Sequence, residues 1–550
     1  MKSLKITSFN IIVFLSALAF TSMFNIYWSL IAFYIVNLIF AAVLWGYLIF
    51  YKDLPKYITS NMRIPDIVLA LMGVAGFGAA RYELMIEFFE RIKVSKSLLI
   101  ESYSVINFMM NNISFFICCG LIVVSIFSFL LFAWLSIRLR PLIIDFFKKM
   151  DQTERIFLYT ASVILFVFSV FLFTKTNIFY LPLNEEAQIM NDAIYVSDSG
   201  SIVGGNAYIN PEHGENDIRQ PLFGVFAMPF AAIIKTISLP FPFSWFYPLL
   251  LNCLQIVLLI LSIILIVRML NLIGTLRKLL IMILFVSSYS VILFSFMMEQ
   301  YIFSVWWLTL FLYLTIEHKK INLLLFVAAA GSLITTVVLA LPFIGYLKNI
   351  RNAIIEAGKC LFIFISFIFA FGLLNILVNV WDKLVVFYNA FGGGTTAGMD
   401  KIYQYTAFIT NMFTAPVFAT SINAYGSPQV VLPLYSTVNY WSLGIFLTAI
   451  AGFCLNTKMI MSKVCLCWLL FSVLLLLIVG YGIQENGLIL YSLYFLWAFM
   501  SLMILFFNKV FGKIPVIEYG IYIIAAVFML YCNFQAMIDI FHFGVMHYPL

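Results

Sequence analysis

Long apolar segments constrain this chain more than any other feature. Of its 550 residues, 64% are hydrophobic and only 10% are charged, whereas soluble domains carry about 25% charged residues. A helix needs about 20 apolar residues to cross the hydrocarbon core of a bilayer, and more than a dozen segments approach that length. These segments are too long for the strands of a membrane barrel, and helices satisfy their own backbone groups in lipid. The sequence therefore predicts an all-α polytopic membrane protein.

The positions of lysine and arginine orient these segments through the positive-inside rule. If the N-terminus is cytoplasmic, basic clusters such as those in 52–63 and 138–155 fall in cytoplasmic loops. This orientation predicts a bundle of thirteen or fourteen crossings with an extracytoplasmic C-terminus. The segment 321–347 has basic residues at both ends, so it is either one span or a pair of half-length helices. The other predicted spans are 9–23, 27–50, 65–80, 113–137, 157–174, 248–270, 279–298, 301–316, 356–379, 442–456, 463–481, 488–507 and 516–533.

Charge and cysteine usage exclude two other interpretations. The formal net charge of +7 is what basic cytoplasmic loops give a membrane protein, so no nucleic-acid partner is expected. All eight cysteines fall inside or at the ends of apolar segments. Their spacing predicts neither a disulfide framework nor a metal site.

Segments between the spans are predicted to lie at the outer face. The segment 81–112 has mixed charges and apolar residues at helical spacing, which predicts an amphipathic helix on the membrane surface. The segment 221–237 is apolar, but a crossing there would leave Arg268, Arg277 and Lys278 outside. We therefore expect 221–237 to be an interfacial helix. The segment 380–441 has the composition of a second external loop.

This topology divides the chain into four parts. The first is an N-terminal four-helix membrane region, 1–156. A core, 157–379, contains an acidic external loop (175–220) and the interfacial helix (221–237). The second external loop, 380–441, and a C-terminal four-helix membrane region, 442–550, follow.

The longest polar stretch, Lys175 to Arg219, contains seven of the 24 acidic residues of the chain. Carboxylates at an outer face can act as general bases or bind divalent cations. The alternative is that they form an ordinary solvated loop. We predict that this stretch is the active-site loop of a membrane enzyme. Its acids are Glu185, Glu186, Asp192, Asp198, Glu212, Glu215 and Asp217.

The order of features in this loop resembles the first external loop of the GT-C glycosyltransferases, membrane enzymes that use polyprenyl-phosphate sugars. That family has an Asp-Glu pair after a span, a small residue eight positions on and a glycine closing the helix. Glu185–Glu186, Ala193 and Gly200 stand at similar positions. A polar residue and a Pro-Leu-aromatic interfacial helix follow in the family, and Arg219–Phe230 is similar to them.

Two later segments extend the resemblance, which covers residues 157–350. Glu299 precedes a long apolar helix, as a glutamate does in the family. The segment 323–344 is similar to the family's small-residue segment, although no lysine follows Thr335 and Thr336. The lipid A aminoarabinose transferases and protein mannosyltransferases are the nearest members in pattern.

The resemblance implies an inverting transfer of a sugar from a polyprenyl-phosphate-linked donor to a cell-envelope glycan, lipid or protein. Glu185 would activate the acceptor hydroxyl or hold a divalent cation such as Mg²⁺ or Mn²⁺, and Glu186 would orient the acceptor or the metal. Glu185 departs from the family's usual aspartate. Arg219, Lys383 and Lys401 would bind the donor phosphate. On the acceptor or metal side the candidates are Asp192, Asp217, Glu299 and Glu485.

Two other functions compete with this one. A transporter or a lipid or polysaccharide flippase is also a large helical bundle, but it usually has ionisable residues at mid-membrane and internal repeats. Neither is evident here. A polysaccharide polymerase or ligase depends on basic residues in its outer loop, whereas this loop is acidic. Richness in Lys, Ile, Asn and Phe suggests a bacterial cytoplasmic (inner) membrane, with the active-site loops extracytoplasmic and membrane lipids around the bundle.

Overall fold

The computed structural model is mostly helical and has the composition of a multi-pass membrane protein. Its described part contains seven helices that are long and apolar enough to cross a bilayer. An eighth results if α11 (Thr275–Ser287) and α12 (Tyr289–Phe296) are taken as one bent span, and five shorter apolar helices accompany them. The all-α membrane fold is thus confirmed, whereas the total of thirteen or fourteen crossings stays a prediction. The structure describes all residues except 1–6, 26–30, 80–112, 181–192, 196, 198–201, 204–207, 209–218, 319–321, 340–341, 343–349, 391–395, 423–425 and 484–486.

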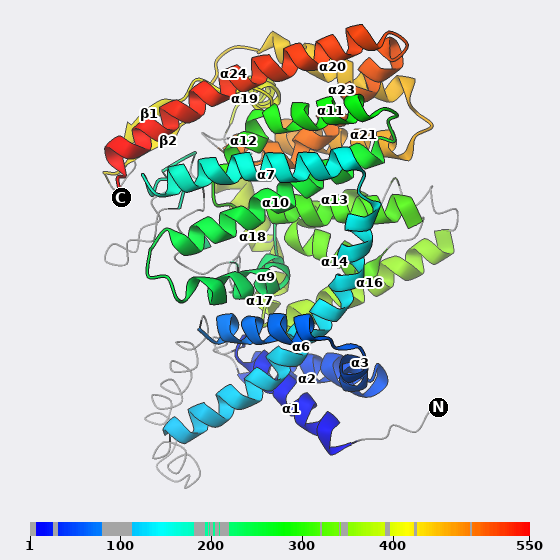
Figure 1. Cartoon of the computed structure of the whole chain (residues 1–550), viewed down its shortest axis with the longest axis vertical. Coiled ribbons are helices and arrows are strands. Elements are labelled where there is room, and N and C mark those ends of the chain that lie inside the picture. Colours follow the sequence, from blue (N-terminus) through cyan, green and yellow to red (C-terminus); the bar gives the residue numbers. More distant parts are fainter. Residues whose placement is uncertain are drawn as a thin grey trace.

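The N-terminal helices gather at one end of the molecule (Figure 1). Phe20 lies at their centre, where its ring contacts those of Phe77 and Phe127 at centroid distances of 5.1 and 5.3 Å. Phe371 joins this aromatic group from the main bundle. The helices are α1 (Ser8–Ser22), α2 (Ile31–Gly46) with its π-helical continuation η1 (Tyr47–Tyr51), α3 (Leu54–Asn61), an apolar helix Ile64–Ala79, and α6 (Ile113–Lys149).

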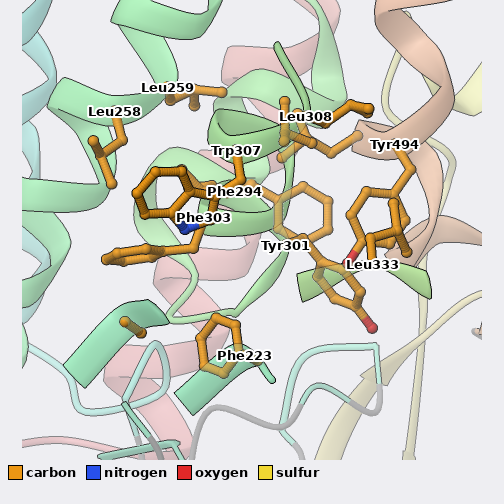
Figure 2. Close-up of a cluster of buried hydrophobic side chains, with 14 of the residues drawn as sticks. Phe223, Leu258, Leu259, Phe294, Tyr301, Phe303, Trp307, Leu308, Leu333 and Tyr494 are labelled. Atoms are coloured by element: carbon orange, nitrogen blue, oxygen red, sulfur yellow. The ribbon is translucent and has the colours of Figure 1, made fainter. Parts of the chain in front are cut away.

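The main bundle is built around α10 (Phe246–Met269). In its most apolar stretch 78% of the residues are buried, whereas in that of α7 (Gln152–Phe173) 39% are. Figure 2 shows the packing beside α10, where Phe303 and Trp307 meet Leu258 and Leu259. The other helices are α9 (Phe223–Ser238), α13 (Tyr301–His318), α14 (Leu323–Ser332), the 3-10 helix η2 (Ile334–Leu339), α16 (Ile350–Ala370), α17 (Leu374–Val378), α20 (Tyr440–Leu455), α21 (Ile460–Ser472) with the π-helix η3 (Val473–Val479), α22 (Gly487–Leu490), α23 (Ser492–Phe511) and α24 (Pro515–His547).

Several predicted spans have different ends in the structure. The helix expected at 113–137 continues as α6 to Lys149, past the basic residues that end the apolar segment. The last helix likewise runs to His547 instead of 533. The span expected at 279–298 is bent by 64° between α11 and α12. The segment 321–347 begins with α14, a half-length helix that ends at Ser332.

The segment 380–441 is more ordered than the loop that its composition predicts. It contains two helices, α18 (Val380–Ala390) and α19 (Gly398–Asn411). A two-stranded antiparallel hairpin follows, in which β1 (Ala419–Ile422) pairs with β2 (Pro428–Val431). Ile194 of the acidic loop forms a parallel bridge with Val430 of β2, so this loop and the segment 380–441 contact each other.

Ion pairs join the helices at the end that the positive-inside rule assigns to the cytoplasm. Arg268 of α10 pairs with buried Glu154 of α7 at 2.6 Å. Lys278 of α11 pairs with Asp151, the N-cap of α7, at 3.0 Å. Buried charges need such partners, because an isolated charge loses its hydration without compensation. Four of the helices of the bundle are therefore tied by charge at one end, since Arg277 of α11 also pairs with Glu518 of α24.

Candidate functional site

A cavity of about 750 Å³ lies among α13, α18, α21, η3, α23 and the segment before α9. Its wall is formed almost entirely by aromatic and aliphatic side chains. Arg219 is the one charged residue that lines it in the described part of the chain. The lining residues are Arg219, Gln220, Tyr301, Leu333, Ile334, Thr335, Trp381, Leu384, Tyr388, Trp468, Leu475, Val479, Tyr481, Tyr491, Tyr494 and Phe495.

Two backbone hydrogen bonds fix the segment that carries Arg219. The Ile334 N–H donates to the Arg219 carbonyl, and the Leu222 N–H donates to the Gly331 carbonyl, each at 2.8 Å. Residue 331 must be glycine for this approach, because a Cβ there would lie 2.7 Å from the Leu222 Cβ. The end of α14 thus positions the turn that leads into α9.

Tyrosine hydroxyls at the start of α23 contact the same segment. The Arg219 Nη1 donates to the Tyr491 hydroxyl at 3.1 Å, and the Gln220 Nε2 donates to the Tyr494 hydroxyl at 2.6 Å. The ring of Tyr301 packs edge-on against Tyr494, with a centroid distance of 5.0 Å. Figure 2 shows Tyr301, Tyr494 and Leu333 side by side. Burial and hydrogen bonding therefore hold the guanidinium and these rings in fixed positions around the cavity.

The other two predicted phosphate-binding cations, Lys401 and Lys383, are not among the described residues that line the cavity. The Lys401 Nζ donates to the carbonyl of Val479, a lining residue, at 3.3 Å. The backbone of Lys383 lies in α18, whose Trp381, Leu384 and Tyr388 line the cavity, while the Lys383 side chain is outside the description. Arg219 thus lines the cavity and Lys401 contacts the backbone of one of its lining residues, and the roles of both stay predictions.

Glu299 precedes α13 as expected, but its side chain is fully buried. Its carbonyl accepts a hydrogen bond from the Tyr208 hydroxyl at 2.7 Å and another from Gln255. Burial raises the pKa of Tyr208 well above its usual range, and the negative charge of Glu299 raises it further. Tyr208 therefore remains protonated and links the acidic loop to the start of α13.

The other predicted carboxylates, Glu185, Glu186, Asp192, Asp217 and Glu485, lie outside the described residues. The described part of the acidic loop shows how it is anchored. The Tyr195 N–H donates to the Val430 carbonyl at 2.9 Å, and the Val430 N–H donates to the Ala193 carbonyl at 2.8 Å. The Tyr195 and Tyr289 hydroxyls are 2.8 Å apart. The residue after Asp192 is thus held by the hairpin.

A divalent cation has no set of ligands among the described side chains. No group of three or more His, Cys, Asp or Glu residues comes together there. The carboxylates predicted to bind Mg²⁺ or Mn²⁺ lie outside the described residues, with the exception of Glu299.

Most of the aromatic wall was not predicted from the sequence. Trp381, Leu384 and Tyr388 recur at helical spacing, and that pattern would have revealed the inner face of α18. Trp468 and Tyr481 carry no such signal, because they lie in or after a predicted span and contact the cavity only through the packing of α21 and η3.

Family models, curated proteins and solved structures were all compared with this chain, and none of them matches.

Proposed function

We propose that this multi-pass membrane protein is a glycosyltransferase that moves a sugar from a polyprenyl-phosphate-linked donor to a cell-envelope acceptor. The observation that carries the proposal is the cavity at Arg219, which combines one guanidinium with an apolar, aromatic wall. Such a wall accepts the apolar parts of an amphiphilic ligand, and a few placed polar groups orient it. Arginine binds phosphate through paired N–H donors.

The reaction needs an acceptor, a base and a stabilised leaving group. Glu185 takes the proton of the acceptor hydroxyl, whose oxygen then attacks the anomeric carbon of the donor sugar. The bond from this carbon to the phosphate oxygen breaks, and polyprenyl phosphate leaves with the bonding electrons. Attack from the face opposite the phosphate inverts the anomeric carbon. Glu186 orients the acceptor.

Arg219 stabilises the charge that develops on the departing phosphate, because its guanidinium is held by the Tyr491 hydroxyl. Lys401 adds positive charge behind the Val479 carbonyl. The tyrosine hydroxyls of Tyr301, Tyr491 and Tyr494 offer hydrogen bonds to the sugar. Few charges lie in the wall, which suits a donor with a monophosphate link.

The test measures the release of free polyprenyl phosphate from a panel of polyprenyl-phosphate sugars by the full chain in proteoliposomes. We expect Arg219→Gln to raise the KM for the donor about tenfold or more, since a tenfold change corresponds to about 1.4 kcal/mol. Arg351→Gln, at an exposed position of α16, is the matched control. Glu185→Gln should lower kcat, whereas Asp198→Asn in the same loop should not.

A wild-type protein that consumes no donor of the panel would contradict the proposal. The next assay would then follow the translocation of lipids or solutes. If Arg219→Gln and Arg351→Gln behave alike in an active enzyme, the transfer stands but the assignment of the cavity is wrong.

A further inference from the structure

A second cavity, of about 660 Å³, lies between α7 and α24 and shares no lining residue with the cavity at Arg219. We call it the α7–α24 groove. Hydrocarbon side chains form nearly all of its wall, with Thr160 and Ser287 the polar exceptions. From α7 it is lined by Ile156, Phe157, Thr160, Ala161, Ile164, Leu165, Phe168, Phe171 and Leu172.

The groove runs along α7, one of the helices long and apolar enough to cross a bilayer. Its α7 residues recur at helical spacing and so occupy one face of the helix. Ile156 and Leu172 are 16 positions apart, which at 1.5 Å per residue gives a length of about 24 Å. The hydrocarbon core of a bilayer is about 30 Å thick. The groove is therefore long enough to hold most of one lipid chain.

The shape of the groove restricts what can occupy it. Aromatic pairs connect α7 to α24 near the extracytoplasmic end of α7, with Phe168 and Phe534 at a centroid distance of 6.0 Å and Phe171 and Phe541 at 5.2 Å. A helix is about 10 Å wide with its side chains, so it cannot pass between these helices. A single hydrocarbon chain is narrower, and it would lie along the groove beside these ring pairs.

Charge at the outer end favours an anionic lipid. Lys175 follows the last turn of α7 and is exposed. It stands three positions after Leu172, the last residue of α7 that lines the groove. It makes no ion pair with any residue in the described ranges.

We propose that the α7–α24 groove binds one acyl chain of an anionic glycerophospholipid of the outer leaflet, with the phosphate at Lys175. The lipid fills the space that the bend between α11 and α12 leaves beside α7, because Ile283, Val286 and Ile292 on either side of the bend line the groove. This lipid is separate from the proposed sugar donor, and the inference does not depend on the proposed function.

The experiment uses the full chain in nanodiscs that contain equal amounts of phosphatidylglycerol and phosphatidylcholine, followed by detergent extraction and native mass spectrometry. We expect wild type to retain phosphatidylglycerol. Ile164→Trp, which fills the groove from a 51% exposed position, should lower retention at least fivefold. Val163→Trp is the matched control, because Val163 is 59% exposed on the same helix and does not line the groove.

A second variant tests the headgroup. Lys175→Gln should retain lipid but lose the preference for phosphatidylglycerol, whereas Lys458→Gln, exposed in the turn between α20 and α21, should keep it. Equal retention by Ile164→Trp and wild type would overturn the proposal. So would an unchanged preference in Lys175→Gln, or retention of an isoprenoid phosphate instead of a glycerophospholipid when the protein is extracted from native membranes.

Discussion

Backbone contacts with residues 331 and 334 fix the position of Arg219 in the structure. The carbonyl of Arg219 is bound by the Ile334 N–H, and the next turn is bound by the Gly331 carbonyl. A hydrogen bond from a buried backbone group is costly to lose, because its partner then remains unsatisfied. The cation of the cavity is thus placed by a backbone contact that depends on the absence of a side chain at residue 331.

The variant Gly331→Ala tests this contact. Its methyl group would lie 2.7 Å from the Leu222 Cβ, so the turn before α9 must move. Overpacking of this kind costs about 1–3 kcal/mol, and we expect a lower thermal midpoint in detergent. Gly358→Ala in α16 is the control, because nothing lies within 4 Å of a Cβ there. An unchanged midpoint for Gly331→Ala would show that Leu222 moves aside without a loss of stability.

Among the elements, the bend between α11 and α12 is supported by segments from elsewhere in the chain. The Tyr289 and Ser290 N–H groups at the start of α12 donate to the Phe413 and Met412 carbonyls after α19. Asn533 of α24 donates to the carbonyls of Ser287 and Phe413, at 2.7 and 2.9 Å. A helix break within a membrane is tolerated where neighbouring groups satisfy the freed backbone, as here.

We therefore expect Asn533→Leu to destabilise the protein strongly. The substitution removes both of these hydrogen bonds and the one that the Asn533 Oδ1 accepts from the Ala415 N–H. Each buried group left unsatisfied costs about 1–3 kcal/mol. The measurement is the thermal midpoint in detergent, with exposed Gln535→Leu on the same helix as the control. Equal midpoints for the two variants would mean that water or other groups replace Asn533.

Hydropathy predicted most helices of this fold, but not their breaks. The bend at Ser288 leaves no mark in the sequence, because the residues that stabilise it lie more than 120 positions away. Helices α18 and α19 were missed because their tyrosines, threonines and charges resemble a loop. Arg219 was singled out by its place before the apolar segment 221–237, and its role stays a prediction. The spacing of apolar residues could have revealed the part of the aromatic wall that α18 supplies, but the parts from α21 and α23 join it only when these helices pack together.

At the scale of the whole molecule, ion pairs fasten one end of the bundle while hydrogen bonds between loops fasten the other. Glu518 illustrates the first: it is fully buried, pairs with Arg277 at 2.8 Å and accepts a hydrogen bond from the Tyr522 hydroxyl. At the other end the C-terminal segment returns to α7, where the Thr176 hydroxyl donates to the Tyr548 carbonyl at 2.7 Å.

Acid should weaken the ion-paired end of the bundle, because Asp151 takes part in one of its ion pairs. Burial raises the pKa of this carboxyl, but hydrogen bonds from the Glu154 N–H and from Lys278 outweigh it and hold the pKa below its ordinary value of 3.8. A pKa depressed by folding adds stability above pH 3.8, and this contribution is lost as the pH falls through the lower folded value.

We expect Asp151→Asn to lower the thermal midpoint at pH 7, since asparagine keeps the helix cap but loses the pair with Lys278. The difference from wild type should shrink as the pH falls below 3.8. Midpoints measured between pH 3 and pH 7 check this. A difference that stays constant with pH would contradict a contribution from the charge of Asp151.

The two backbone hydrogen bonds between the Arg219 turn and the segment 331–334 also give a way to measure motion at the cavity. The backbone of Arg219 cannot move away unless the Leu222 and Ile334 amides open, since both donate in this contact. Their exchange with deuterium therefore reports the rate of that opening. If a ligand closes the cavity, the two amides should slow together, while amides of α16, none of whose described residues lines the cavity, keep their rates.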